Sequence, residues 1–149
     1  MDNPTRLSPG EQVEFSKTIT ESDFAFFSAI SGDFDPVHVN EEYARGTAFG
    51  RRIAHGGLVM GVLSTVASLM SHRSKDRGAA GTPVSLGYDR IRFIKPVFVG
   101  DTLTARYTIE EVDEKAVRSR SKVEITNQEG QLCLTGNHIL KWVLEQRAF

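Results

Sequence analysis

The chain has 149 residues, of which 40% are hydrophobic and 25% are charged, and its formal net charge is −1. These values are typical of one globular domain and give no support to nucleic acid or an anionic membrane as the main partner. Cys133 is the only cysteine, which excludes an intramolecular disulfide and a cysteine-rich zinc site. The first residues lack the apolar segment of a secretory signal, so a cytoplasmic, reducing location is expected.

The first predicted elements are a strand and a short helix. Residues 11–20 alternate apolar and polar side chains, which predicts a strand. Thr20 has the features of a helix N-cap with Asp23 as its capping-box partner, and Gly32 is the expected end of that helix. The apolar positions are Val13, Phe15 and Ile19 on the strand, and Phe24, Phe27 and Ile30 on the helix.

A loop and a second short helix are predicted next. Residues 32–39 are expected to form a loop, because Pro36 disfavours helical geometry at Asp35. Asn40 can cap a helix that continues to about Arg45. The side chains expected to be buried on this helix are Tyr43 and Ala44.

A long apolar helix is predicted to begin at Gly56 or Gly57, after a glycine-punctuated loop. Its apolar segment, residues 53–70, is nearly long enough to span a bilayer, but a central helix buried in a soluble domain explains it equally. We adopt the buried helix, because the rest of the chain has the pattern of a soluble sheet. Residues 72–83 are polar and glycine-rich and are expected to form a mobile loop.

The second half of the chain is predicted to be antiparallel sheet. Apolar positions change phase near Asp89, which indicates a bulge within one strand. Three more strands are expected over residues 101–112, 117–125 and 132–144. The chain is therefore predicted to be a single α+β domain, residues 1–149, with five strands wrapped on one helix. Because such a sheet leaves open edges, pairing of two sheets in a homodimer is expected.

The stretch SGDFDPVHVN places Asp33, Asp35 and His38 close together on a bent backbone. Asp33 and His38 can share one water and move protons near neutral pH. Alternatively, both aspartates cap the turn and His38 is a structural donor, which the spacing alone slightly favours. A metal site is a third possibility, but no HxxxH or HxH pair accompanies these residues.

The helix start, AHGGL, permits two interpretations. Backbone N–H groups at Gly56 and Gly57 can stabilise an oxyanion, or the glycines only permit a tight turn and close packing. Ser64 lacks a GxSxG motif, so it bonds back to its own helix or donates a hydrogen bond into a pocket. The other histidines, His55, His72 and His138, have no evident partner in the sequence, which makes two of them structural and His72 a solvated loop residue.

Three segments together resemble a known family. SGDFDPVH, FGRRIAHGGLVMGVLS and RFIKPVFVGDTL are similar, in this order, to the MaoC-like hydratases, which are (R)-specific enoyl-CoA hydratases of the hot-dog fold. The resemblance covers residues from about 10 to about 143. It implies a hot-dog domain that hydrates trans-2-enoyl-CoA to (R)-3-hydroxyacyl-CoA, or catalyses the reverse dehydration. It also implies an acyl-CoA substrate, no metal and no redox cofactor.

The family pattern suggests roles for individual residues. Asp33 and His38 match the catalytic pair that holds and activates water, Gly56 N–H matches the group that binds the thioester oxygen, and Ser64 matches a supporting helix serine. Asp35 departs from the family's usual Asn and makes the identity of the acyl group uncertain. Further candidates for substrate contacts are His55 and Gly57, and the candidates for the CoA phosphates are Arg51, Arg52, Arg90, Arg92 and Lys95. Two rival functions are a hot-dog thioesterase and a non-catalytic acyl-CoA-binding module.

Overall fold

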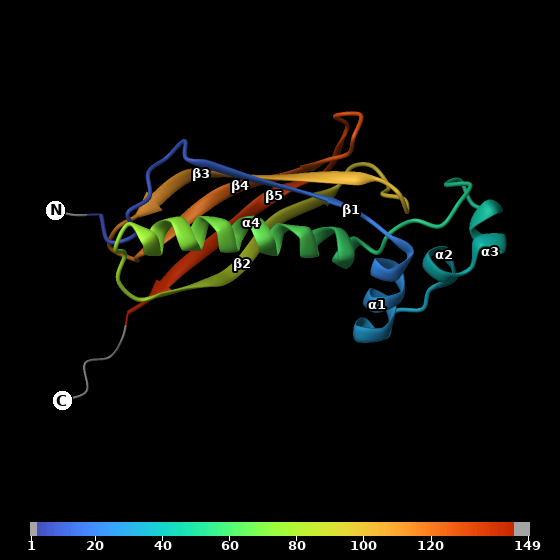
Figure 1. Ribbon diagram of the computed structural model, residues 1–149, viewed down its shortest axis with the longest axis horizontal. Coiled ribbons are helices and arrows are strands. Elements are labelled where there is room, and N and C mark those ends of the chain that lie inside the picture. The colour runs from blue at the N-terminus through green and yellow to red at the C-terminus, as the bar shows by residue number, and fades with distance from the viewer. Residues whose placement is uncertain (1–2, 145–149) are drawn as a thin grey trace.

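The computed structural model describes residues 3–144, so the predicted domain, residues 1–149, extends beyond them at both ends. Five antiparallel strands form one sheet in the order β1-β3-β4-β5-β2 (Figure 1). The elements in chain order are β1 (Gln12–Thr18), α1 (Glu21–Ser31), α2 (Pro36–Val39), α3 (Glu41–Arg45), α4 (Gly56–Asp76), β2 (Thr82–Phe93), β3 (Thr102–Asp113), β4 (Arg118–Thr126) and β5 (Leu132–Val143). This is the α+β arrangement predicted from the sequence.

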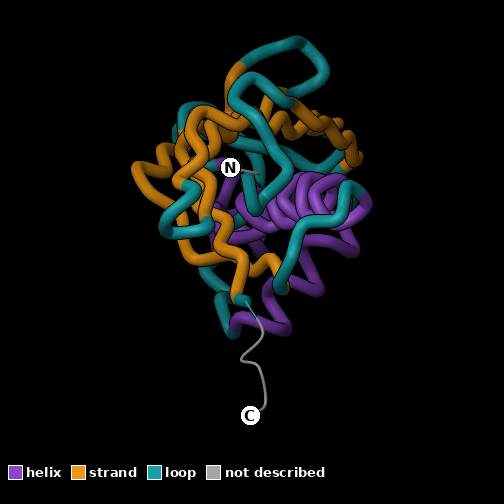
Figure 2. The backbone as a smooth tube through the Cα atoms, turned by 90° about the vertical axis from the view of Figure 1, so that its left-hand side faces the viewer, coloured by secondary structure: helices purple, strands orange, loops and turns teal. Residues whose placement is uncertain are grey.

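Helix α4 forms the centre of the core, and the strands curve around it (Figure 2). One side of α4 is buried against the sheet through residues such as Leu63, Val66 and Met70. Alternate residues of β3, including Leu103 and Tyr107, are fully buried on the facing side, as the period of two predicted. Within residues 3–144 no helix is long and apolar enough to cross a membrane, which agrees with the buried-helix interpretation.

The predicted loop over residues 72–83 is wrong at both ends, because α4 continues to Asp76 and β2 begins at Thr82. Basic residues Arg73 and Lys75 lie in the last turn, where the negative end of the helix dipole favours them. Ser74 is buried and donates a hydrogen bond to the backbone oxygen of Thr5. A polar sequence thus continues a helix when one of its faces still has a buried partner.

The predicted bulge in β2 is confirmed. The pairing of β2 with β5 shifts register between Asp89 and Arg92, and Arg90 adopts a φ of 54°. The shift explains why the apolar positions change phase along this strand.

Helices α1–α3 lie together beyond one end of the sheet (Figure 1). The predicted caps are confirmed: Thr20 and Asp23 form a capping box, Gly32 ends α1 with a φ of 75°, and Asn40 caps α3. Residues 36–39 are helical rather than a loop, because the Asp35 side chain accepts a hydrogen bond from the backbone N–H of Val37 and caps that turn.

Burial on these short helices differs from the prediction at two positions. Ile30 is 81% exposed and Tyr43 is 53% exposed, whereas Phe24 and Ala44 are buried as expected. The buried residues of α1 are Phe24 and Ser28, one turn apart, whereas Ile30 lies two residues after Ser28, about 200° around the helix, and so faces away from them.

A polar group is buried within the core. His138 on β5 is fully buried, with Nδ1 2.9 Å from the Tyr107 hydroxyl and Nε2 2.7 Å from the Ser85 hydroxyl. Burial lowers the pKa of His138 to about 4 and raises the pKa of Tyr107 to about 12. The imidazole therefore stays uncharged near neutral pH.

Candidate active site

The candidate site lies where the 32–35 loop, α2 and the first turn of α4 meet. The loop is held by local hydrogen bonds: the Asp33 backbone N–H donates to Ser31 Oγ (3.1 Å), and Asp33 Oδ1 accepts from the Asp35 N–H (3.1 Å). These are the turn-capping bonds that the structural interpretation predicted. They occupy one carboxylate oxygen of Asp33 and leave Oδ2 available for another partner.

His38 also uses one of its two polar atoms for structure. Its Nδ1 lies 2.7 Å from the carbonyl oxygen of Ile53, and since a carbonyl only accepts, Nδ1 carries the hydrogen. The other nitrogen, Nε2, lies 3.9 Å from Asp33 Oδ2. This gap is too long for a direct hydrogen bond, but a single water can bridge it. The capping interpretation is confirmed on one polar atom of each side chain, and the other polar atom of each is left for an acid–base role.

His55 lies behind this pair and is 2% exposed. Its Nε2 is 3.0 Å from the backbone carbonyl oxygen of Asp33 and 3.1 Å from Ser28 Oγ. Its ring stacks on the ring of His38, with centroids 3.9 Å apart and planes inclined by 27°. The phenyl ring of Phe27 packs against another side of His55 at 4.8 Å.

Gly56 is the first residue of α4, and within the described residues its N–H has no acceptor. Both glycines of the motif also allow close packing. A Cβ on Gly56 would lie 2.7 Å from the ring of Phe93, and one on Gly57 would lie 2.5 Å from the ring of Phe27. Close packing and a free N–H at the positive end of the helix dipole thus coexist at this turn.

A pocket of about 420 Å³ opens beside His38 and Gly56. Most of its wall is apolar, which suits a hydrocarbon chain better than a sugar or a polar metabolite. The apolar side chains include Phe49, Ile53 and Phe93.

Ser64 is not in contact with this pair. It lies about 12 Å further along the axis of α4 than Gly56, at roughly 1.5 Å per residue, and its side chain is exposed. The Asp35 side chain is occupied as the cap of α2 and is exposed to solvent.

Of the candidate cations, Arg52 has strong partners of its own. Its guanidinium pairs with Glu21 at 2.5 Å and with Glu41 at 2.9 Å, and these carboxylates raise its pKa against the opposing effect of burial. Arg52 thereby joins the first turns of α1 and α3. Arg51 instead stacks over the ring of Phe98, 3.7 Å from its centroid.

The other three cations lie along β2 and just after it. Lys95 is exposed and lines the apolar pocket, and it also lines an adjoining polar hollow that contains Arg51. Arg90 is exposed at the bulge, and Arg92 donates to the backbone oxygen of Ile91. Lys95 thus borders the apolar pocket and Arg51 borders the adjoining hollow, while Arg52, whose charge is already paired, lines another hollow that also contains His38.

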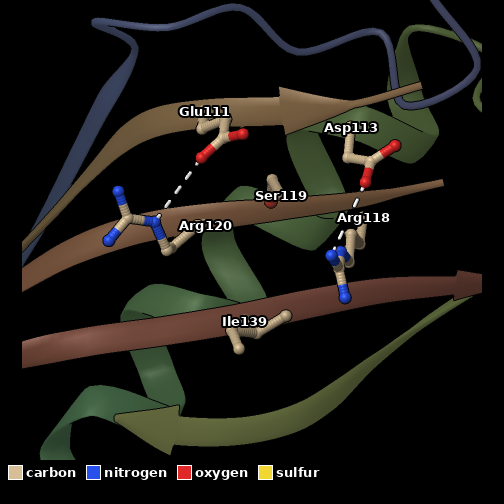
Figure 3. Close-up of a pocket in the computed structure, with 6 residues that line it drawn as sticks. All are labelled: Glu111, Asp113, Arg118, Ser119, Arg120 and Ile139. Atoms are coloured by element: carbon tan, nitrogen blue, oxygen red, sulfur yellow. Dashed lines mark ion pairs between the residues drawn. The ribbon is translucent and has the colours of Figure 1, made fainter. Parts of the chain in front are cut away.

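A second hollow, of about 130 Å³, lies over β3, β4 and β5 (Figure 3). Its charges are paired with each other: Arg120 with Glu111 at 3.7 Å, and Arg118 with Asp113 at 3.6 Å. These pairs leave little charge for a ligand, and the hollow includes neither Asp33 nor His38.

Asp33, His38 and His55 offer potential metal-ligand atoms that lie within 4.8 Å of one another. Nε2 of His55 already contacts Ser28 Oγ and the Asp33 carbonyl oxygen, and a metal there would have to displace both.

Sequence reasoning missed three contributors to this site: the Ile53 carbonyl, Ser28 and Phe93. A backbone carbonyl has no sequence signal. Ser28 has a weak one, because it lies one turn after Phe24 on the buried stripe of α1, where an apolar residue is expected.

Comparisons with known proteins agree with this architecture. Residues 4–131 match the family model described as MaoC like domain. An (R)-specific enoyl-CoA hydratase of Rhodospirillum rubrum is 41% identical over 69% of this chain and 66% of its own length, just under two thirds. An (R)-specific enoyl-CoA hydratase of Aeromonas caviae is 32% identical over 91% of this chain and 95% of its own length.

A solved structure extends the comparison to the fold. The unliganded R-hydratase PhaJ1 from Pseudomonas aeruginosa superposes with a TM-score of 0.79 and 29% identity, over 96% of this chain and 86% of its own. The sheet wrapped around α4 is the hot-dog arrangement that the resemblance implied. The chain therefore belongs to the MaoC-like dehydratase family of hot-dog hydro-lyases.

Proposed function

We propose that this chain catalyses the reversible syn addition of water to a trans-2-enoyl-CoA, giving an (R)-3-hydroxyacyl-CoA, or the reverse dehydration. One observation carries the proposal: Asp33 Oδ2 and His38 Nε2 face each other across 3.9 Å, while the other polar atom of each side chain is held by the backbone. Two acceptors fixed in this way can hold one water by both of its hydrogens.

The bound water is then directed as a nucleophile. With both hydrogens donated to Asp33 and His38, its lone pair can attack C3 of the enoyl group. The lone pair forms the C3–O bond while one proton of the water passes to Asp33 or His38. The electrons of the C2=C3 bond then form the C1=C2 bond of an enolate, and the carbonyl electrons move onto the thioester oxygen. Asp33 and His38 then return a proton to C2 from the same face. Both parts of the water are thereby added to the substrate, with syn geometry.

The enolate oxygen needs a donor while the charge is on it. Gly56 N–H is suited to this role, since it begins α4 and borders the same pocket as His38. A lost oxyanion donor typically costs about 10²–10³ in rate. We do not assign Ser64 a contact with Asp33 or His38 of the same chain, because its hydroxyl is exposed and lies far along α4 from them.

The apolar pocket is assigned to the acyl chain next to the thioester. Phe49, Ile53 and Phe93 supply the apolar wall. The phosphates of CoA are assigned to Arg51 and Lys95, which border the site and its adjoining hollow. This reaction uses no metal and no redox cofactor, because a conjugated thioester is already electrophilic at C3.

We further propose that the chain acts as a homodimer, with its sites near the subunit boundary. Strand β2 lies at one edge of the sheet, and its side chains Val84 and Leu86 are 38% and 56% exposed. A long apolar edge is normally covered in native proteins. Pairing with the same edge of a second copy covers it.

One assay separates this function from its two rivals. Purified protein is mixed with crotonyl-CoA, and the enoyl absorbance and free thiol are followed together. Loss of absorbance without thiol release is the expected result. Thiol release would identify a thioesterase, and no change in either signal would favour a binding module.

A further inference from the structure

We propose that His55 is a positioning residue, which sets the places of the three groups that carry the reaction. This inference rests on the proposed hydratase function. The first contact is with Asp33, whose backbone carbonyl oxygen lies 3.0 Å from His55 Nε2. The loop that carries Asp33 has no regular structure of its own, so this bond ties the catalytic carboxylate to the buried end of α4.

The partners of His55 assign its tautomer. A carbonyl oxygen only accepts, so Nε2 carries the hydrogen and donates it to Asp33, with Ser28 Oγ at 3.1 Å as a second partner. The opposite tautomer would place the Nε2 lone pair against the lone pairs of that carbonyl. Ser28 comes from α1, so the His55 edge joins α1, the 32–35 loop and α4 at one point.

The second contact is with His38. Its ring is fixed at one edge by the Ile53 carbonyl and on one face by the His55 ring, 3.9 Å away. These two restraints point Nε2 of His38 toward Asp33 Oδ2. The third link is covalent, because His55 is the residue before Gly56, whose N–H is the proposed oxyanion donor.

A purely structural role explains His55 less well. Buried polar atoms are normally paired, yet Nδ1 of His55 is buried without a partner in the described part of the chain. A phenylalanine would fill the same space and stack on His38 without that cost. Phenylalanine lacks the N–H that reaches the Asp33 carbonyl. Position 55 therefore requires that N–H donor.

Two amide substitutions separate positioning from folding. In H55Q the amide nitrogen can reach the place of Nε2 and donate to Asp33, whereas in H55N it reaches only the place of Nδ1. Asparagine is the better N-cap for α4, so a structural role predicts that H55N is at least as stable and active as H55Q. H55F keeps the stacked ring without a donor, and H72F is the matched control at an exposed histidine on the same helix.

We expect kcat to fall in the variants that lack an N–H donor at the place of His55 Nε2, whatever their stability. H55N and H55F should lower kcat by about 10²-fold, H55Q by about ten-fold or less, and H72F should match the wild type. KM for crotonyl-CoA should change little, since no CoA contact is removed. Equal kcat values for H55N and H55Q, or a kcat that follows Tm across the series, would overturn the proposal.

A second measurement decides the matter even if these variants fail to fold. Histidine ¹⁵N NMR of the wild type should show His55 with hydrogen on Nε2, and hydrogen on Nδ1 instead would overturn the proposal. S28A, which removes only the second partner, should retain this tautomer and most of the activity. Failure of the hydratase function is a separate outcome, since a wild type inactive on crotonyl-CoA would leave the tautomer result readable.

Discussion

The buried His138 makes the stability of this protein depend on pH in a defined window. Its ordinary pKa of 6.5 falls to about 4 in the folded state because burial disfavours the charged ring. Between these two values the unfolded chain binds a proton at this site and the folded chain does not. Stability is therefore complete above about pH 6.5, falls as the pH drops, and levels off below about pH 4.

The magnitude follows from the two pKa values. A pKa lowered from 6.5 to about 4 corresponds to a total loss of roughly 3 kcal/mol. About 2 kcal/mol of this should already be lost at about pH 5. Urea denaturation between about pH 7.5 and pH 5 measures the free energy of unfolding in this window.

The matched variant is His138→Gln, which does not titrate and whose amide can still bond the Ser85 hydroxyl at the place of Nε2. It should be less stable than the wild type at pH 7.5, because the amide fills the site less well. Its stability should fall less between pH 7.5 and pH 5, by about 2 kcal/mol. Equal pH dependence in the two proteins would refute the reasoning, since all other titrating groups are shared.

Three further predictions concern the site and the assembly. Arg51→Ala and Lys95→Ala should each raise KM for the CoA substrate with little change in kcat. Unchanged KM in both variants would reject the phosphate assignment. Arg52→Ala should mainly lower Tm, because it breaks two ion pairs. Asp35→Asn should keep activity within an order of magnitude, because an amide oxygen can still cap α2, and an inactive but folded variant would mean that the wrong carboxylate has been chosen. Analytical ultracentrifugation at micromolar concentration should show a dimer or an assembly of dimers, and a monomer alone would exclude the proposed pairing.

Local patterns predicted most of the fold. The strands were readable from the period of two, and α1 and α3 were readable from Thr20 and Asn40 at their N-caps. These signals act within a few residues, so they can be read from the sequence without tertiary information. The short α2 is not predicted by the sequence pattern, because Pro36 disfavours helical geometry only at Asp35 before it and itself stands in the first turn of α2, where proline is favoured.

Burial and atom-level roles depended on tertiary placement. Ile30 follows Phe24 at twice the predicted spacing of three, but the next buried residue after Phe24 is Ser28, four residues on, so Ile30 lies on another face and is 81% exposed. Arg52 has the same sequence context as Arg51, yet only Arg52 reaches the carboxylates of Glu21 and Glu41. No spacing rule separates these neighbours.

The candidate site illustrates the same division. The sequence placed Asp33 and His38 on one loop, but left open whether they cap a turn or move protons. The structure shows one atom of each residue in a backbone hydrogen bond and the other facing its neighbour. The choice between the two interpretations was unnecessary, since a side chain with two polar atoms can serve both.

The most direct test of the account is kcat for Asp33→Asn with crotonyl-CoA. The amide oxygen can take the place of Oδ1 and accept from the Asp35 N–H, so the loop and Tm should be retained. The amide nitrogen then faces His38 as a donor and cannot accept a hydrogen from the bridging water. The account predicts a fall in kcat of about 10²–10⁴ in a folded protein. A folded Asp33→Asn variant nearly as fast as the wild type would contradict it.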